Sequence, residues 1–194
     1  MKKILFLFSL CMLACSAAWA QYTSGYGIEK STQFEVVAGG NLSNWSSTNS
    51  NAKWHPGFHV GVRGTCNFAS LERTPYLNAG LLLSLKGVNA DDVNFNAYYL
   101  DLPIHFGYSA QVSDGVNIFG EVGPYLGVGL FGEIEGLDTF DLLKRFDLGL
   151  GGRFGVEFNH KFNISFGFDH GLLEVMDDLD FKNMNMTLQL GYKF

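Results

Sequence analysis

The most constraining feature of this sequence is the strict alternation of its last twelve residues, Asn183 to Phe194. The intervening positions are polar or glycine, and every second residue is apolar: Met184, Met186, Leu188, Leu190, Tyr192 and Phe194. A period of two is that of a β-strand, because successive side chains of a strand point to opposite faces. One face of this strand must therefore meet an apolar medium, and the strand ends on an aromatic residue.

The same alternation recurs along the chain, so the sequence predicts eight strands. They span residues 34–42, 57–68, 76–86, 97–112, 116–132, 145–158, 162–171 and 183–194. The connections alternate between long and short, beginning with a long one, as in outer-membrane barrels. An even strand count lets the last strand pair with the first, which leaves no unpaired edge in hydrocarbon. We predict an all-β fold, a single closed eight-stranded antiparallel transmembrane up-and-down barrel over residues 34–194.

The spacing of outward aromatic residues favours a membrane over water. Phe58 and Phe68 share one face ten residues apart, as do Tyr98 and Tyr108. Ten tilted strand residues rise roughly 25 Å, about the height of the apolar band between two aromatic girdles. The alternative is a soluble β-sandwich with these aromatics in its core. A sandwich does not explain why the opposite face of nearly every strand carries charge.

Residues 1–20 read as a secretory signal peptide. A charged start, Lys2-Lys3, precedes an apolar stretch over 4–14, and Ala18-Trp19-Ala20 resembles a cleavage site, so the mature chain should begin at Gln21. The apolar stretch is too short to span a bilayer as a helix. The alternative is a poor lipobox that would make Cys15 a lipidated first residue. Residues 21–33 then form a short periplasmic lead-in to the barrel.

The charge of the mature chain excludes one class of partner. Removing residues 1–20 leaves 11 basic and 19 acidic side chains, a net charge of −8. A nucleic-acid partner would require a basic face, so none is expected. A single cysteine, Cys66, remains, which rules out a disulfide framework in the mature chain.

The polar faces of the strands should point into the lumen. The interior of an eight-stranded barrel is just wide enough for side chains to fill, and buried charges must be paired. We therefore expect a lumen charge network that plugs the barrel, with Arg63 and Arg153 as cationic hubs that each meet more than one carboxylate. The alternative is a path for protons or ions. The expected members are Glu35, Arg63, Asp101, His105, Glu121, Asp147, Arg153, Glu157 and Asp169.

No catalytic or metal-binding pattern is evident, so neither an enzyme nor a cofactor is expected. His170 lies near Glu174, but no serine shares that face to complete a nucleophilic set. The acids Glu174, Asp177, Asp178 and Asp180 lack the spacing of a calcium loop. We expect them to be solvated, or bridged to lipopolysaccharide by divalent ions.

Several stretches carry a resemblance to a known family. They are Gly39-Gly40-Asn41-Leu42-Ser43, residues 54–61, Tyr99-Leu100-Asp101-Leu102-Pro103, Glu121-Val122-Gly123-Pro124-Tyr125 and Leu190-Gly191-Tyr192-Lys193-Phe194. With them the chain resembles the outer-membrane β-barrel proteins labelled porin-family or PorT-like. The resemblance implies that the final strand, through Leu190, Tyr192 and Phe194, is the signal read by the barrel-assembly machinery. It does not imply an activity, because one fold hosts many functions.

The expectation for function follows from the charged lumen. We expect an integral protein of the bacterial outer membrane, monomeric, with both termini periplasmic and a structural or interaction role. Its partners would be outer-membrane lipid, lipopolysaccharide and the barrel-assembly machinery. Two alternatives stay open: a small channel or transporter for a small solute, and a subunit of a secretion apparatus.

Overall fold

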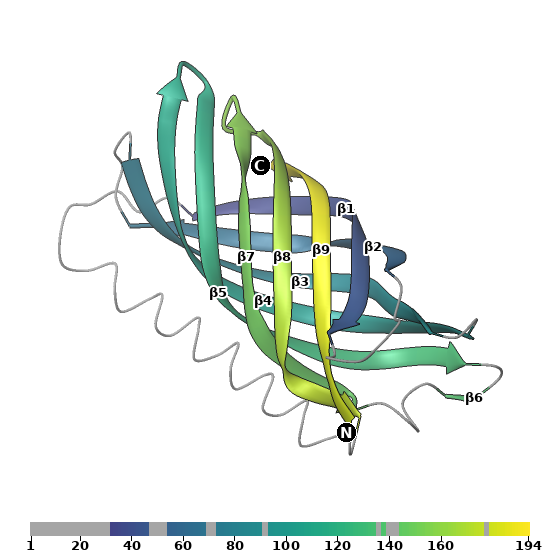
Figure 1. Ribbon diagram of the computed structural model, residues 1–194. Coiled ribbons are helices and arrows are strands. Elements are labelled where there is room, and N and C mark those ends of the chain that lie inside the picture. Colours follow the sequence, from purple (N-terminus) through teal and green to yellow (C-terminus); the bar gives the residue numbers. More distant parts are fainter. Residues whose placement is uncertain are drawn as a thin grey trace, which may run out of the picture.

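Eight long antiparallel strands form a closed barrel in the computed structural model, which describes residues 32–46, 54–68, 73–90, 93–134, 137–138, 144–176 and 179–194 (Figure 1). The strands are β1 (Thr32–Ser46), β2 (His55–Asn67), β3 (Arg73–Ala90), β4 (Val93–Ser113), β5 (Val116–Ile134), β7 (Phe146–Phe158), β8 (Phe162–Met176) and β9 (Leu179–Lys193). A two-residue strand, β6 (Leu137–Asp138), pairs with the end of β5. Within the described residues, no helix is long and apolar enough to cross a membrane.

The barrel closes because the first strand pairs with the last. β1 and β9 run antiparallel from Glu35 opposite Lys193 to Ser46 opposite Lys182. Every other long strand pairs with its two neighbours in the chain, and β5 pairs with β7 across β6. The backbone N–H of Phe194 donates to the carbonyl of Phe34 at 3.0 Å. The prediction of a closed eight-stranded barrel is confirmed.

Short turns gather at the end of the barrel where β1 begins at Thr32 and β9 ends at Lys193, which we call the termini end after these two strand ends (Figure 1). The β4–β5 turn is Asp114-Gly115, with φ of +70° at the glycine, as a tight hairpin requires. Asn159 and His160 adopt φ of +50° and +56° in the β7–β8 turn. The two turns contact each other, because the N–H of Asn159 donates to the carbonyl of Gly115 at 2.6 Å.

Two segments that the sequence predicts to be long loops, 87–96 and 172–182, are mostly paired strand. In the first, β3 and β4 continue to the pair Ala90 and Val93. In the second, β8 and β9 continue to the pair Met176 and Leu179. The reason is that backbone hydrogen bonds hold a hairpin together. These bonds can continue beyond the apolar belt, where neither face of the strands has to carry apolar side chains. The alternation of apolar and polar residues therefore ends before the backbone pairing of the strands ends. Asp177 and Asp178 lie outside the described residues.

The two faces of the sheet are inverted relative to a water-soluble protein. Phe154, Leu190 and Phe194 on the outside are 63%, 64% and 72% exposed, whereas Glu35 and Asn78 on the inside are each 1% exposed. The outward face presents a belt of large apolar side chains contributed by all eight strands. Such an exterior needs an apolar solvent, since soluble proteins rarely expose large contiguous apolar patches. The polar core is therefore where a functional site has to be sought.

Candidate functional site in the barrel interior

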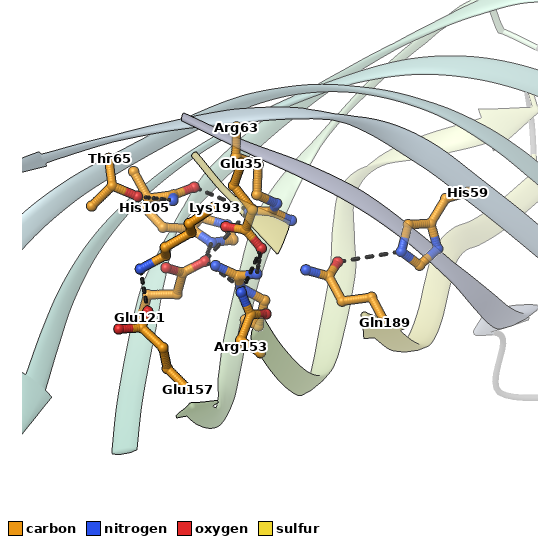
Figure 2. Close-up of polar contacts among 12 residues, drawn as sticks. Glu35, His59, Arg63, Thr65, His105, Glu121, Arg153, Glu157, Gln189 and Lys193 are labelled. Carbon is orange, nitrogen blue, oxygen red and sulfur yellow. Dashed lines mark hydrogen bonds and ion pairs between the residues drawn. The ribbon is translucent and has the colours of Figure 1, made fainter. Parts of the chain in front are cut away.

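A single carboxylate, Glu121 of β5, is the centre of the interior (Figure 2). Its Oε1 accepts from Arg153 Nε at 2.7 Å and from Arg63 Nη1 at 3.4 Å. His105 Nδ1 lies 3.3 Å from the same oxygen, and the Tyr76 hydroxyl donates to Oε2 at 3.1 Å. The four partners come from β7, β2, β4 and β3, so one acid joins five strands across the lumen.

A second carboxylate, Glu35 of β1, extends the cluster to the strands that close the barrel. Arg153 Nη1 lies 3.7 Å from Glu35 Oε1, and Asn163 of β8 donates to the same oxygen at 2.8 Å. Arg63 makes its other side-chain hydrogen bond to Asn78 Oδ1 at 3.2 Å. Thus Arg153 meets two carboxylates, whereas Arg63 meets one ion-pair partner among the described residues. The geometry makes an acid rather than an arginine the hub.

At the termini end, Glu157 of β7 binds the ammonium group of Lys193 of β9. Asn117 donates to Glu157 Oε1 at 3.1 Å, and His160 Nδ1 lies 3.4 Å from that oxygen. The His160 side chain is 60% exposed, so this group forms the mouth of the barrel.

A third group lies toward the opposite end of the barrel. Lys86 Nζ of β3 donates to Asp101 Oδ1 of β4 at 2.8 Å and lies 5.2 Å from the ring centres of Tyr99 and Tyr125. The Tyr125 hydroxyl donates to Asp147 at 3.0 Å. A buried ammonium between a carboxylate and two aromatic faces is stabilised by both.

The remaining predicted carboxylates contact amides. Asn183 donates to Asp147 Oδ2 at 2.9 Å, and Asn185 donates to Asp169 Oδ2 at 3.4 Å. Of the nine predicted residues, the structure brings together Glu35, Arg63, His105, Glu121 and Arg153, and it places Asp101, Asp147, Glu157 and Asp169 in separate smaller groups.

Sequence reasoning left Tyr76, Lys193 and the inward asparagines out of the expected network. The sequence nevertheless places each of them on the polar face, because each alternates with the outward apolar residues of its own strand. Lys193, for example, alternates with the outward residues Tyr192 and Phe194.

The space left between these groups is small. A cavity of about 30 Å³ lies among His59, Arg63, His105, Arg153, Asp169 and Gln189. The buried atoms His59 Nδ1, His105 Nε2, Arg63 Nε and Gln189 Nε2 have no hydrogen-bond partner among the described residues. A polar cavity of this size holds one or two water molecules, which would satisfy such atoms. Among the described residues, no group of three or more His, Cys, Asp and Glu side chains is arranged to hold a metal ion.

Comparison with known proteins gives one family match. A family model described as "Outer membrane protein beta-barrel domain" matches residues 19–177. No curated protein matches the chain.

Solved barrels are similar in fold at low sequence identity. Neisserial surface protein A is 16% identical with a TM-score of 0.50, over 84% of this chain and 99% of its own. The attachment invasion locus protein Ail of Yersinia pestis is 14% identical with a TM-score of 0.47, over 84% and 98%. OprG of Pseudomonas aeruginosa is 12% identical with a TM-score of 0.45, over 85% and 97%.

Proposed function

Because the chain belongs to the outer membrane protein β-barrel domain family, we propose that it is an integral protein of the bacterial outer membrane whose interior is plugged by ion-paired side chains. Its role is then structural or interactive, not transport or catalysis. The observation that carries this proposal is the Glu121 cluster, which joins β2, β3, β4, β5 and β7 across the lumen. Contacts of 2.7 to 3.4 Å across the bore, beside a cavity of about 30 Å³, favour a plugged interior over a path for a solute.

The proposal includes a topology and a maturation step. The strands at the termini end stop at short turns, whereas the β3–β4 and β8–β9 hairpins extend at the other end through segments 87–96 and 172–182. Outer-membrane barrels have short periplasmic turns and longer extracellular connections, which supports periplasmic termini. Cleavage after Ala20 would release a mature chain beginning at Gln21. N-terminal sequencing of the membrane-extracted protein tests this step, and a lipid-modified Cys15 would contradict it.

The proposed partners are those of the membrane itself. Phospholipid and lipopolysaccharide would contact the apolar belt and the strand ends opposite the termini end. The barrel-assembly machinery would recognise Leu190, Tyr192 and Phe194. A monomer is sufficient for these contacts. The narrower PorT-like relationship, and with it a place in a secretion apparatus, would require a partner protein to co-purify with the barrel.

Single-channel recording on the refolded barrel in a planar bilayer tests the plug. We expect no conductance steps from the wild type. As a positive control, replacing Arg63, Glu121 and Arg153 together with serine removes the central side chains and should admit ions. Conductance by the wild type, with a selectivity changed by Arg153→Ala, would instead establish the small-channel alternative.

A further inference from the structure

The outward surface of β4, β5, β7 and β8 contains a groove of about 570 Å³. These four strands are neighbours in the barrel wall (Figure 1). The floor of the groove includes the outward glycines Gly120 of β5 and Gly152 of β7. Its walls are apolar side chains, namely Phe106, Tyr108, Val122, Phe154, Phe166 and Phe168. The side chains of Glu121 and Arg153, whose strands form the floor, are buried in the lumen, so the groove presents no charge.

The floor is open because nothing covers Gly120. A Cβ atom placed there would meet no atom within 4 Å. The outward Gly64 of β2 differs, since a Cβ there would lie 3.7 Å from the ring of Phe34. An aromatic ring thus covers one outward glycine and leaves the other bare.

Two contacts between aromatic rings involve wall residues of the groove. Phe154 packs against Phe166 with ring centres 5.5 Å apart, and Phe106 stacks on Phe68 at 6.5 Å. Rings engaged in such pairs gain stability from them. Folding these rings over the glycine floor would break both pairs.

Size and polarity define the occupant. Small-molecule sites range from about 300 to 1,000 Å³, and protein interfaces use about 20–30 residues a side, far more than the six wall residues. An extended peptide would bring polar backbone groups that an uncharged groove in hydrocarbon cannot satisfy. An alkyl chain has no such groups and follows the curved floor by van der Waals contact.

The groove lies nearer the termini end of the belt. Gly120 is the fifth of the 19 residues of β5, counted from the turn at that end. We propose that the groove binds one acyl chain of a phospholipid in the leaflet on the termini side, an inference that rests on the membrane location proposed above.

Photolabelling tests this site. The refolded barrel is placed in phosphatidylethanolamine–phosphatidylglycerol vesicles that contain a phosphatidylethanolamine with a diazirine on one acyl chain, and labelled peptides are identified by mass spectrometry. We expect labelling concentrated on Phe106, Phe154 and Phe166. Gly120→Leu fills the floor without a clash and should lower this labelling about threefold through lost packing contacts. Gly40→Leu is the matched control, because an outward Cβ there has one neighbour at 3.9 Å, the carbonyl of Gly57, and the residue lies on β1; it should change nothing.

The outcomes separate this inference from the proposed function. Even labelling around the belt, or labelling unaffected by Gly120→Leu, overturns the lipid site and leaves the membrane barrel intact. A photoreactive amino acid incorporated in place of Val122 tests for a second copy of the chain: crosslinks between two copies through the groove would show that a second copy occupies it, which also overturns the proposal. Failure of the wild type to insert, seen as no labelling and no heat-dependent gel shift, would instead reject the membrane location and the site with it.

Discussion

Replacing Glu121 with alanine should be among the most damaging changes to the interior. The substitution removes the acceptor of Arg153 Nε, Arg63 Nη1 and the Tyr76 hydroxyl at once. Arg153 keeps Glu35 at 3.7 Å, whereas Arg63 keeps the Asn78 amide at 3.2 Å and loses its carboxylate among the described residues.

The expected loss follows from leaving charge buried. Removing one partner of a buried ion pair costs about 3–5 kcal/mol, because the other charge stays desolvated. Arg63 is 5% exposed and Arg153 is 6% exposed, so water cannot readily replace the missing carboxylate. We expect the free energy of unfolding to fall by this amount in Glu121→Ala. Glu121→Gln keeps an accepting oxygen for the arginines and should therefore lose less than Glu121→Ala.

Urea unfolding in phospholipid vesicles, followed by tryptophan fluorescence, measures this difference. Lys161→Ala is the control, since it removes an exposed charge in the β7–β8 turn and should have little effect. If the free energy of unfolding fell by less than about 1 kcal/mol in Glu121→Ala, the lumen would be hydrated, because only a solvated arginine can lose its carboxylate partner at so small a cost in stability. That result would refute the plug.

Three further outcomes are expected. The folded protein should fractionate with the outer membrane and run faster unboiled than boiled on a detergent gel; recovery as a soluble protein would contradict the membrane assignment. Replacing Tyr192 and Phe194 with polar residues should block assembly, and normal folded levels in a pulse-chase experiment would show that these side chains are dispensable. Lys193→Ala should lower the free energy of unfolding by about 1–2 kcal/mol, less than Glu121→Ala, because its ion pair with Glu157 lies at the barrel mouth, where water can compensate; an equal loss in urea titrations would contradict this ranking.

The sequence predicts the strands well and the contacts between them poorly. Alternation gives each side chain a face, which is enough to place Glu121 and Arg153 in the interior. It does not give register between strands, so it cannot show that these two residues lie directly opposite each other on β5 and β7. Register here is a property of the closed sheet, in which all eight pairings must hold together.

Side-chain alternation within single strands also fails to predict the central acid of the interior and the ends of the hairpins. An acid that meets three basic side chains from three other strands cannot be identified from any one of them, and the sequence instead favours the arginines because they are fewer. The sequence predicts a loop at the ends of β3 and β4 because alternation stops near Gly87, yet backbone pairing continues to Ala90 and Val93. Alternation with a period of two indicates that the two sides of a sheet face different solvents. It gives no prediction where both sides face water.

The pairing of β1 with β9 has a consequence for the order of folding. These strands lie at opposite ends of the described chain, so their contacts have nearly the largest sequence separation the protein offers. Contacts of that kind carry the greatest loop-closure entropy and form late. The hairpins β4–β5 and β7–β8 can form early from local contacts, but the β1–β9 seam, the pairing that closes the barrel, can form only when the whole chain is present. Until then both edges stay open to other strands, and the interval before the seam closes is when this protein is most exposed to misassembly.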